Sequence, residues 1–281
     1  MEPQPPSEPE TESTEIDRYT HGYSSVFSDF LARRSATSNA AFFLPHLHSN
    51  MDLLDCGCGP GTITAGLAQV VYPGRAVGID LATSQVELAR TNAAQQDINN
   101  VDFSTGNIYA LPFQNGSFDA IFGHSILEHV GDPMRALLEM RRVLKPTGLA
   151  GFREVDQGGN LLEPPLPLLE KSFDLQETVW RSNGGDPRLG RKLGVMLRHA
   201  GFAQIEMSGS YDVYSTPEEL AVWSRRMVDN FSSQSLMDNL TATGLASTSE
   251  ITQTRKAWTD WATHPDGFYA RARVEAVARL A

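Results

Sequence analysis

The sequence has few cysteines, little positive charge and no long apolar run. Of its 281 residues only two are cysteine, and 23 lysines and arginines stand against 34 aspartates and glutamates, which gives a formal net charge of −11 at pH 7. Two cysteines, Cys56 and Cys58, are too few for a disulfide framework or a cysteine-rich metal site. We therefore expect the protein to be located in the reducing cytoplasm. The acidic balance argues against nucleic acid as a partner. No apolar stretch reaches the roughly 18 residues of a membrane span, and we expect no signal peptide and no metal.

What the chain does contain is room for one α/β domain of roughly 150–200 residues with smaller flanking regions. Residues 1–16 are rich in proline and glutamate, and we expect a disordered tail there. Residues 17–48 carry apolar residues at spacings of three and four, which predicts an N-terminal helical lid. Residues 49–214 form the main predicted domain, and residues 215–281 indicate a helical C-terminal cap.

Short apolar segments alternate with helical patterns through the main domain, which predicts a Rossmann-like, doubly wound α/β fold with a mostly parallel seven-stranded sheet. The predicted strands are 51–56, 76–80, 101–104, 118–122 and 149–152. The predicted helices are 62–71, 84–95, 133–144 and 187–200, with 217–230 and 250–263 in the cap. Residues 203–214 are predicted to form the last two strands as a hairpin around Ser208-Gly209.

A glycine turn is the most informative feature of the sequence. The run Leu53-Leu54-Asp55-Cys56-Gly57-Cys58-Gly59-Pro60-Gly61-Thr62 leads from an apolar strand through three glycines into a helical pattern. Glycine permits positive φ and close approach of a ligand, and the helix N-terminus offers unpaired N–H groups, so an anionic or nucleotide-like ligand is expected. A dinucleotide fingerprint would need glycine where Thr62 stands, and a P-loop would need a lysine that is missing.

A second apolar segment ends on an acid. Asp80 closes the run Ala76-Val77-Gly78-Ile79, 19 positions beyond Gly61. A carboxylate at the end of the next strand can accept hydrogen bonds from both ribose hydroxyls of a nucleoside. The alternative interpretation is a helix N-cap, with Thr83 and Ser84 nearby.

Further segments complete a family pattern. They are Gly106-Asn107-Ile108-Tyr109-Ala110-Leu111-Pro112-Phe113, Phe118-Asp119-Ala120-Ile121-Phe122 and Arg142-Val143-Leu144-Lys145-Pro146-Thr147-Gly148. Together with the glycine turn they resemble the class I S-adenosylmethionine (SAM) dependent methyltransferases of the ubiquinone/menaquinone-biosynthesis and sterol C-methyltransferase type. The resemblance covers roughly residues 50–155 and implies SAM as the cofactor and a small-molecule methyl acceptor.

The resemblance also implies roles for individual residues. Asn107, which stands where the family usually has Asp, would hold the adenine amino group, and Ile108 and Leu81 would flank the adenosine. Gly57 and the turn at Gly123-His124 would face the methionine part through backbone atoms, and Gly59 and Gly61 belong to the same cofactor-binding turn as Gly57. Asp55 would hold the glycine turn and reach the ammonium group.

Candidate catalytic groups follow the fourth and fifth strands, because ligands of open α/β sheets bind at the carboxyl ends. Glu154 and Asp156 are two residues apart and share a face if the chain is extended, and His124 follows the fourth strand. Each of these three residues could instead be structural. We expect His129 to be a structural histidine at a helix end and Glu128 to be a solvated or capping group. Tyr19, His21 and Tyr23 are predicted either to close over SAM or to brace the first helix, and Arg33 and Arg34 either reach the cofactor carboxylate or are solvated.

These patterns predict a SAM-dependent methyltransferase that acts on a lipophilic or natural-product acceptor of secondary metabolism. C-, O- and N-methylation stay open, and so does assembly as a homo-oligomer. Two other hypotheses remain: a SAM-binding scaffold or regulator without catalysis, and an NAD-dependent oxidoreductase.

Overall fold

A computed structural model describes residues 24–280. The predicted tail and Tyr19, His21 and Tyr23 lie outside the described residues. The elements up to the fifth strand are α1 (Ser25–Ala32), α2 (Ala36–Asn39), η1 (Leu44–His46), β1 (Leu53–Cys56), α3 (Thr62–Val71), β2 (Ala76–Asp80), α4 (Thr83–Gln95), β3 (Val101–Thr105), β4 (Phe118–His124), η2 (Leu127–His129), α5 (Pro133–Val143) and β5 (Leu144–Val155). The later elements are η3 (Gln157–Gly159), β6 (Leu161–Glu163), α6 (Pro167–Ser182), η4 (Leu189–Lys192), α7 (Leu193–His199), β7 (Phe202–Tyr214), α8 (Pro217–Asn230), α9 (Gln234–Ala242), α10 (Thr248–Trp261) and β8 (Phe268–Leu280).

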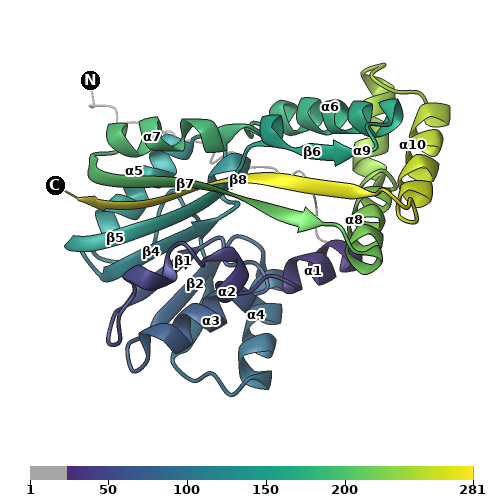
Figure 1. Cartoon of the computed structure of the whole chain (residues 1–281). Coiled ribbons are helices and arrows are strands. Elements are labelled where there is room, and N and C mark those ends of the chain that lie inside the picture. The colour runs from purple at the N-terminus through teal and green to yellow at the C-terminus, as the bar shows by residue number, and fades with distance from the viewer. Residues whose placement is uncertain (1–23, 281) are drawn as a thin grey trace, which may run out of the picture.

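The sheet confirms the predicted doubly wound α/β class (Figure 1). Within residues 24–280 it has eight strands in the order β3-β2-β1-β4-β5-β8-β6, and β7 pairs with the other edge of β8. The pairs among β1 to β5 are parallel, whereas β8 runs antiparallel to β5, β6 and β7. The sheet therefore has one strand more than the seven predicted.

Two strands were not predicted, β6 and β8, and the two strands predicted within residues 203–214 are one. β8 comes from the segment predicted to be a helical cap. Residues 215–281 do form α8, α9 and α10, but the chain then returns into the sheet as β8. Ala, Arg and Glu favour helices locally, and they hide the alternation of Arg271, Arg273 and Glu275 with small apolar residues. Burial between two neighbouring strands overrides that local preference.

The predicted hairpin around Ser208-Gly209 is also wrong. Residues 202–214 form a single strand, β7, in which Ser208 pairs with Glu275 and Gly209 with Val274. The partner strand lies at the far end of the sequence, so pairing with β8 overrides the local turn signal.

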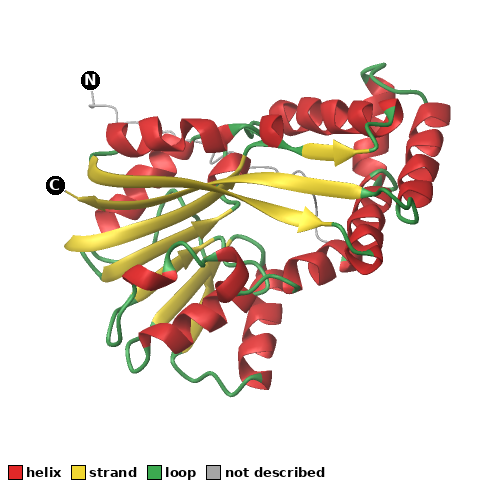
Figure 2. Ribbon diagram, in the orientation of Figure 1, coloured by secondary structure: helices red, strands yellow, loops and turns green. Residues whose placement is uncertain are grey.

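Helices cover both faces of the sheet (Figure 2). One face packs against α2 and α3 through a cluster that includes Phe43, Leu53 and Phe122, and the other packs against α5 and α7 through Leu54 and Phe152. A third cluster joins α6, α8, α9 and α10 to the start of β8, and it buries Trp223, Trp258 and Trp261. Strand β8 therefore connects the cap helices to the sheet: its start packs in the third cluster, and its length pairs with β5 and β7. No helix among the residues described has the length and apolarity to cross a bilayer.

Candidate active site

A hollow lies at the carboxyl ends of β1, β2 and β4, where an open α/β sheet binds its ligands. Segments that are far apart in the sequence line it: α1 and the residues after it, the glycine turn, the end of β2, the loop after β3, and the end of β4. Its lining includes Leu31, Arg34, Asp55, Gly57, Gly59, Asp80, Leu81, Gln85, Asn107, Ile108, Tyr109, His124, Ser125, Ile126 and His129. Most of the residues predicted from sequence to bind the cofactor are thus brought together.

The glycine turn has the backbone that its sequence predicts. Gly57, Gly59 and Gly61 have φ values of +76°, +51° and +74°. A Cβ atom at Gly57 would lie 2.8 Å from Ile126 Cδ1, so any larger residue would push that side chain across the hollow. Gly61 is not part of the lining: a Cβ there would meet Ala89 and Phe103, which makes it a packing position.

The carboxylate of Asp80 points into the loop that carries the glycines. One oxygen accepts a hydrogen bond of 2.8 Å from the backbone N–H of Gly59, and the other accepts one of 2.9 Å from Ala82. Each carboxylate oxygen can accept a second hydrogen bond, so two hydroxyl groups of a ligand can still be bound. The N-cap residue of α4 is Ala82 rather than Asp80. Burial raises the pKa of Asp80.

Asp55 is buried beneath the turn. Its carboxylate accepts a hydrogen bond of 2.5 Å from the hydroxyl of Thr64. Burial raises its pKa to about 7, partly opposed by Thr64 and reinforced by the nearby charge of Asp80. A cation in the hollow, such as an ammonium group, would favour the ionised form.

The adenine end of the hollow is more open. Asn107 is exposed, and its side-chain oxygen accepts a hydrogen bond of 2.9 Å from the N–H of Tyr109. Ile108 is half-buried, and Leu81 leaves 47% of its surface exposed although it lines the hollow. The exposed apolar side chain of Leu81 can therefore pack against an aromatic ring of a ligand in the hollow.

Gln85 is a site residue that the sequence did not suggest. It lies in the first turn of α4, is 3% exposed and lines the hollow. Its side-chain oxygen has no hydrogen-bond partner among residues 24–280. A buried acceptor without a donor is costly, so this oxygen points to a ligand that carries a hydroxyl or amino group. The one sequence signal is its place five residues after Asp80.

His124 at the end of β4 is the candidate catalytic residue that does line the hollow. Its Nε2 faces two donors, Nη1 of Arg153 at 3.2 Å and the amide nitrogen of Asn39 at 3.4 Å. Nε2 therefore accepts, and the proton belongs on Nδ1. Burial and the guanidinium groups of Arg34, Arg273 and Arg153 hold the pKa of His124 well below its usual range. The imidazole is neutral and is a poor proton acceptor.

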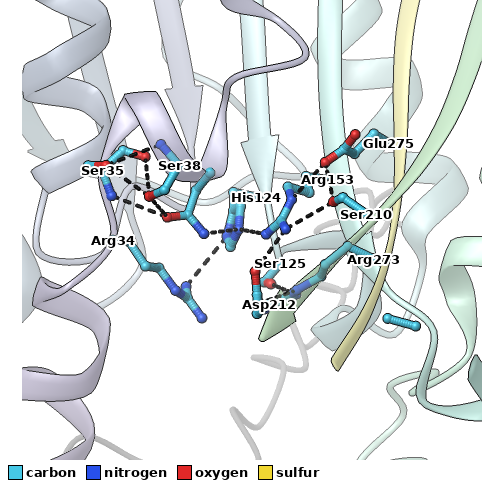
Figure 3. Close-up of polar contacts among 12 residues, drawn as sticks. Arg34, Ser35, Ser38, His124, Ser125, Arg153, Ser210, Asp212, Arg273 and Glu275 are labelled. Atoms are coloured by element: carbon cyan, nitrogen blue, oxygen red, sulfur yellow. Dashed lines mark hydrogen bonds and ion pairs between the residues drawn. The ribbon is translucent and has the colours of Figure 1, made fainter. Parts of the chain in front are cut away.

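A row of charged residues continues from His124 across β5, β8 and β7 (Figure 3). Arg153 donates to Glu275 at 3.0 Å and to Asp212 at 2.8 Å. Arg273 donates to Asp212 at 2.8 Å and to the hydroxyl of Ser125 at 2.6 Å. The row lies on the sheet face that α1 and α2 approach. It joins the hollow to the antiparallel part of the sheet.

Glu154 and Asp156 lie outside the lining of the hollow. Glu154 is fully buried and accepts hydrogen bonds from the backbone N–H groups of residues 126–128. Burial and the neighbouring Glu128 raise its pKa well above its usual range. Asp156 is paired with Arg191 through two hydrogen bonds of 2.6 Å.

These contacts do not support a catalytic role for either carboxyl group. They share no face toward the hollow because the chain turns into η3 directly after Asp156. Gly123 also lies outside the lining of the hollow, and a Cβ atom there would meet Ile126 and Phe152. Within residues 24–280, no group of three or more His, Cys, Asp or Glu side chains is placed to hold a metal ion.

Comparison with known proteins identifies the family. The family model described as "Methyltransferase domain" matches residues 47–201, which is more than half of the chain. This chain belongs to the methyltransferase domain family. It is therefore a SAM-dependent methyltransferase, and S-adenosylmethionine is its cofactor.

Individual relatives agree. The methyltransferase is 29% identical over 219 residues to an uncharacterized methyltransferase of Schizosaccharomyces pombe, covering 74% of this chain and 77% of the relative. It is 33% identical over 128 residues to the demethylmenaquinone methyltransferase of Lactococcus lactis, covering 45% of this chain and 48% of that enzyme. A solved structure of Haemonchus contortus phosphoethanolamine N-methyltransferase 2 with S-adenosylhomocysteine shares the fold, with a TM-score of 0.57, 17% identity, and coverage of 91% of this chain and 57% of that one.

Asp80→Ala is expected to weaken SAM binding by about 1–3 kcal/mol, or about 5- to 150-fold, because the ribose hydroxyls lose a charged acceptor. Isothermal titration calorimetry with SAM measures this loss. Asp102→Ala is the matched control, because Asp102 pairs with the exposed Arg75 and lies outside the hollow. Equal SAM affinity of Asp80→Ala and the wild type would contradict the ribose assignment.

Proposed function

We propose that this methyltransferase acts on a small, partly apolar acceptor that reaches the cofactor hollow from the side of α1 and α8. We place it in the cytoplasm, in keeping with its two free cysteines, and in secondary metabolism. The net charge of −11 favours a small molecule over nucleic acid as the acceptor.

For the cofactor, we propose that Asp80 and Gln85 bind the ribose hydroxyls and that Asn107, Ile108 and Leu81 hold the adenine. Gly57 and Gly59 leave space for the methionine part, and Asp55 carries the negative charge nearest to its ammonium group. Arg34 lines the hollow with its Nη1 3.5 Å from Nδ1 of His124. Both nitrogens are donors, and a carboxylate oxygen of the methionine part can accept a hydrogen bond from each.

For the acceptor, the supporting observation is a second cavity of about 310 Å³ on the other side of Arg34. Arg34 lines both spaces, and Asn39, which lines the second, contacts His124, which lines the first. The second cavity has an apolar wall, formed by Phe30, Val213, Tyr214 and Val222. A molecule with an apolar body therefore fits beside the methyl donor. Tests with acceptors decide among C-, O- and N-methylation.

The chemistry needs alignment more than proton transfer. SAM supplies the electrophilic methyl group and its leaving group. The residues of the hollow orient the acceptor and exclude water. Neutral His124 donates through Nδ1 and is already an acceptor at Nε2, so we assign it a positioning role. An acceptor whose nucleophilic atom is ionised or carries a free lone pair suits such a site.

Incubation with SAM labelled in its methyl group and a panel of quinols, prenylated compounds, sterols, amines and organic acids tests this proposal. Label in an acceptor is the expected result. SAM binding without transfer to any of these classes would favour the alternative, a SAM-binding scaffold or regulator. Binding of NAD in place of SAM would contradict both.

Asp156→Asn is expected to leave turnover and the KM for SAM unchanged, because its carboxylate bonds to Arg191 and not to the hollow. Loss of the two-point ion pair should lower the free energy of unfolding, because the buried carboxylate of Asp156 loses its charged partner. Urea unfolding and a methyl-transfer assay measure the two effects. Asp260→Asn serves as control, since its pair with Lys256 is exposed and should contribute less than about 1 kcal/mol. A fall in turnover without a loss of stability would return Asp156 to the catalytic candidates.

A further inference from the structure

The second cavity contains donors that the protein does not satisfy. Arg273 lines it, and its Nε and Nη1 bond to Asp212 and Ser125. Its Nη2 makes no hydrogen bond with the described residues. Arg153, the neighbouring guanidinium on β5, uses all three nitrogens on Glu275, His124, Ser210 and Asp212. Arg153 is therefore fully bonded within the fold. Arg273 can still donate a hydrogen bond from Nη2 to a ligand in the cavity.

Arg271 is the more unusual group. It is 3% exposed and makes no hydrogen bond or ion pair with residues 24–280. It lies two positions before Arg273 on the same face of β8, and its register partner is Asp212, which lines the cavity. A buried guanidinium without a partner carries a large desolvation cost, and a bound anion would offset it.

Arginines gather on this face of the sheet. Four guanidinium groups lie on or beside it: Arg34, Arg153, Arg271 and Arg273. Arg153 is fully bonded to its partners, and Arg34 lines the cofactor hollow. Arg271 and Arg273 are therefore the two guanidinium groups of this set that can serve a second anion.

We propose that the acceptor is an organic acid whose carboxylate binds Arg273, which lines the second cavity, and Arg271, two positions before it on the same face of β8. This inference rests on the proposed function, since it gives the substrate class of the same site. The apolar wall of Phe30, Val213, Tyr214 and Val222 takes the body of the molecule, and the arginines fix the end that carries the carboxylate. Arg34, between the two spaces, stays with the carboxylate of the cofactor. The carboxylate orients the acceptor and takes no part in bond making.

The test uses benzoate as the carboxylate probe and benzamide as its neutral analogue. Both are titrated calorimetrically into full-length protein saturated with S-adenosylhomocysteine, so that the cofactor carboxylate already occupies its own site. Benzoate should bind at least about tenfold more tightly than benzamide, as expected for a charge-assisted pair. Arg271→Met should remove that preference. Arg75→Met, at the exposed pair with Asp102, should keep it.

Thermal unfolding separates a ligand role from a structural one. Removing an unpaired buried charge should leave the melting temperature of Arg271→Met unchanged or raise it, whereas a structural arginine would lower it. The inference is overturned if benzoate and benzamide bind equally, if Arg271→Met keeps the preference, or if benzoate binds only without S-adenosylhomocysteine. Tighter binding of phenyl phosphate than of benzoate would also overturn the carboxylate assignment. Failure to bind S-adenosylhomocysteine at all would instead contradict the proposed function.

Discussion

Gly61→Ala should lower the free energy of unfolding by about 2–5 kcal/mol, the sum of left-handed backbone strain and overpacking. Gly61 has a φ of +74° and begins α3 as its N-cap residue. A Cβ atom there would lie 2.6 Å from Cβ of Ala89 and 2.8 Å from Cζ of Phe103. Because α3, α4 and β3 meet at this point, relief of the clash would move the turn that lines the hollow. Chemical denaturation of the cofactor-free protein measures the loss.

Gly244→Ala is the matched control for this prediction. Gly244 follows α9, outside the lining of the hollow, and has a φ of +69°. A Cβ atom at this position would have no described neighbour within 4 Å. The substitution should cost only the backbone strain, about 1–2 kcal/mol. If the two variants lose the same stability, close packing is not the reason for glycine at position 61.

Asp55→Asn should abolish a pH dependence of stability that amounts to about 4 kcal/mol. Burial raises the pKa of Asp55 from 3.8 to about 7 in the folded chain. A carboxyl group with a raised pKa stabilises the fold while it is protonated, and that stabilisation is lost as the pH rises from about 4 through about 7. The amide cannot ionise. The unfolding free energy of the wild type, minus that of Asp55→Asn, should therefore fall across this range and be level above pH 8.

Other titratable groups are common to both proteins and cancel in the difference, so unfolding at several pH values without cofactor is sufficient. Thr64→Val provides an internal check. It removes the hydrogen bond of 2.5 Å that lowers the pKa of Asp55, so the fall should extend to higher pH. A difference between wild type and Asp55→Asn that stays constant from pH 4 to pH 8 would show that Asp55 is ionised throughout.

The parallel half of the fold could be predicted from sequence because its signals are local. Helix α3 and strand β2 have the predicted bounds, and the glycine turn has the predicted positive φ values. Each of these elements carries its own apolar run, cap or glycine. The antiparallel half could not be predicted in the same way, since β7 and β8 are stabilised by one another and by β5 across long separations in sequence.

Some residues of the candidate site could likewise be predicted from local sequence signals, and others could not. Asp80 and the glycines follow two successive strands, and each is marked by its own local pattern: a glycine turn after β1 and an acid at the end of β2. The arginines of β8 appear in the sequence only as alternating charges, and no pattern shows that they reach the side of His124. The contacts of Asp156 could not be predicted for the converse reason: its position after β5 suits catalysis, but Arg191, 35 residues later, pairs with it.

The most direct test of the account is a crystal structure of the protein with S-adenosylhomocysteine. The two ribose hydroxyls should lie within hydrogen-bonding distance of the Asp80 carboxylate, the methionine carboxylate should contact Arg34, and the sulfur should face the second cavity. A ribose bound away from Asp80, or a sulfur directed away from the cavity between α1 and α8, would contradict it.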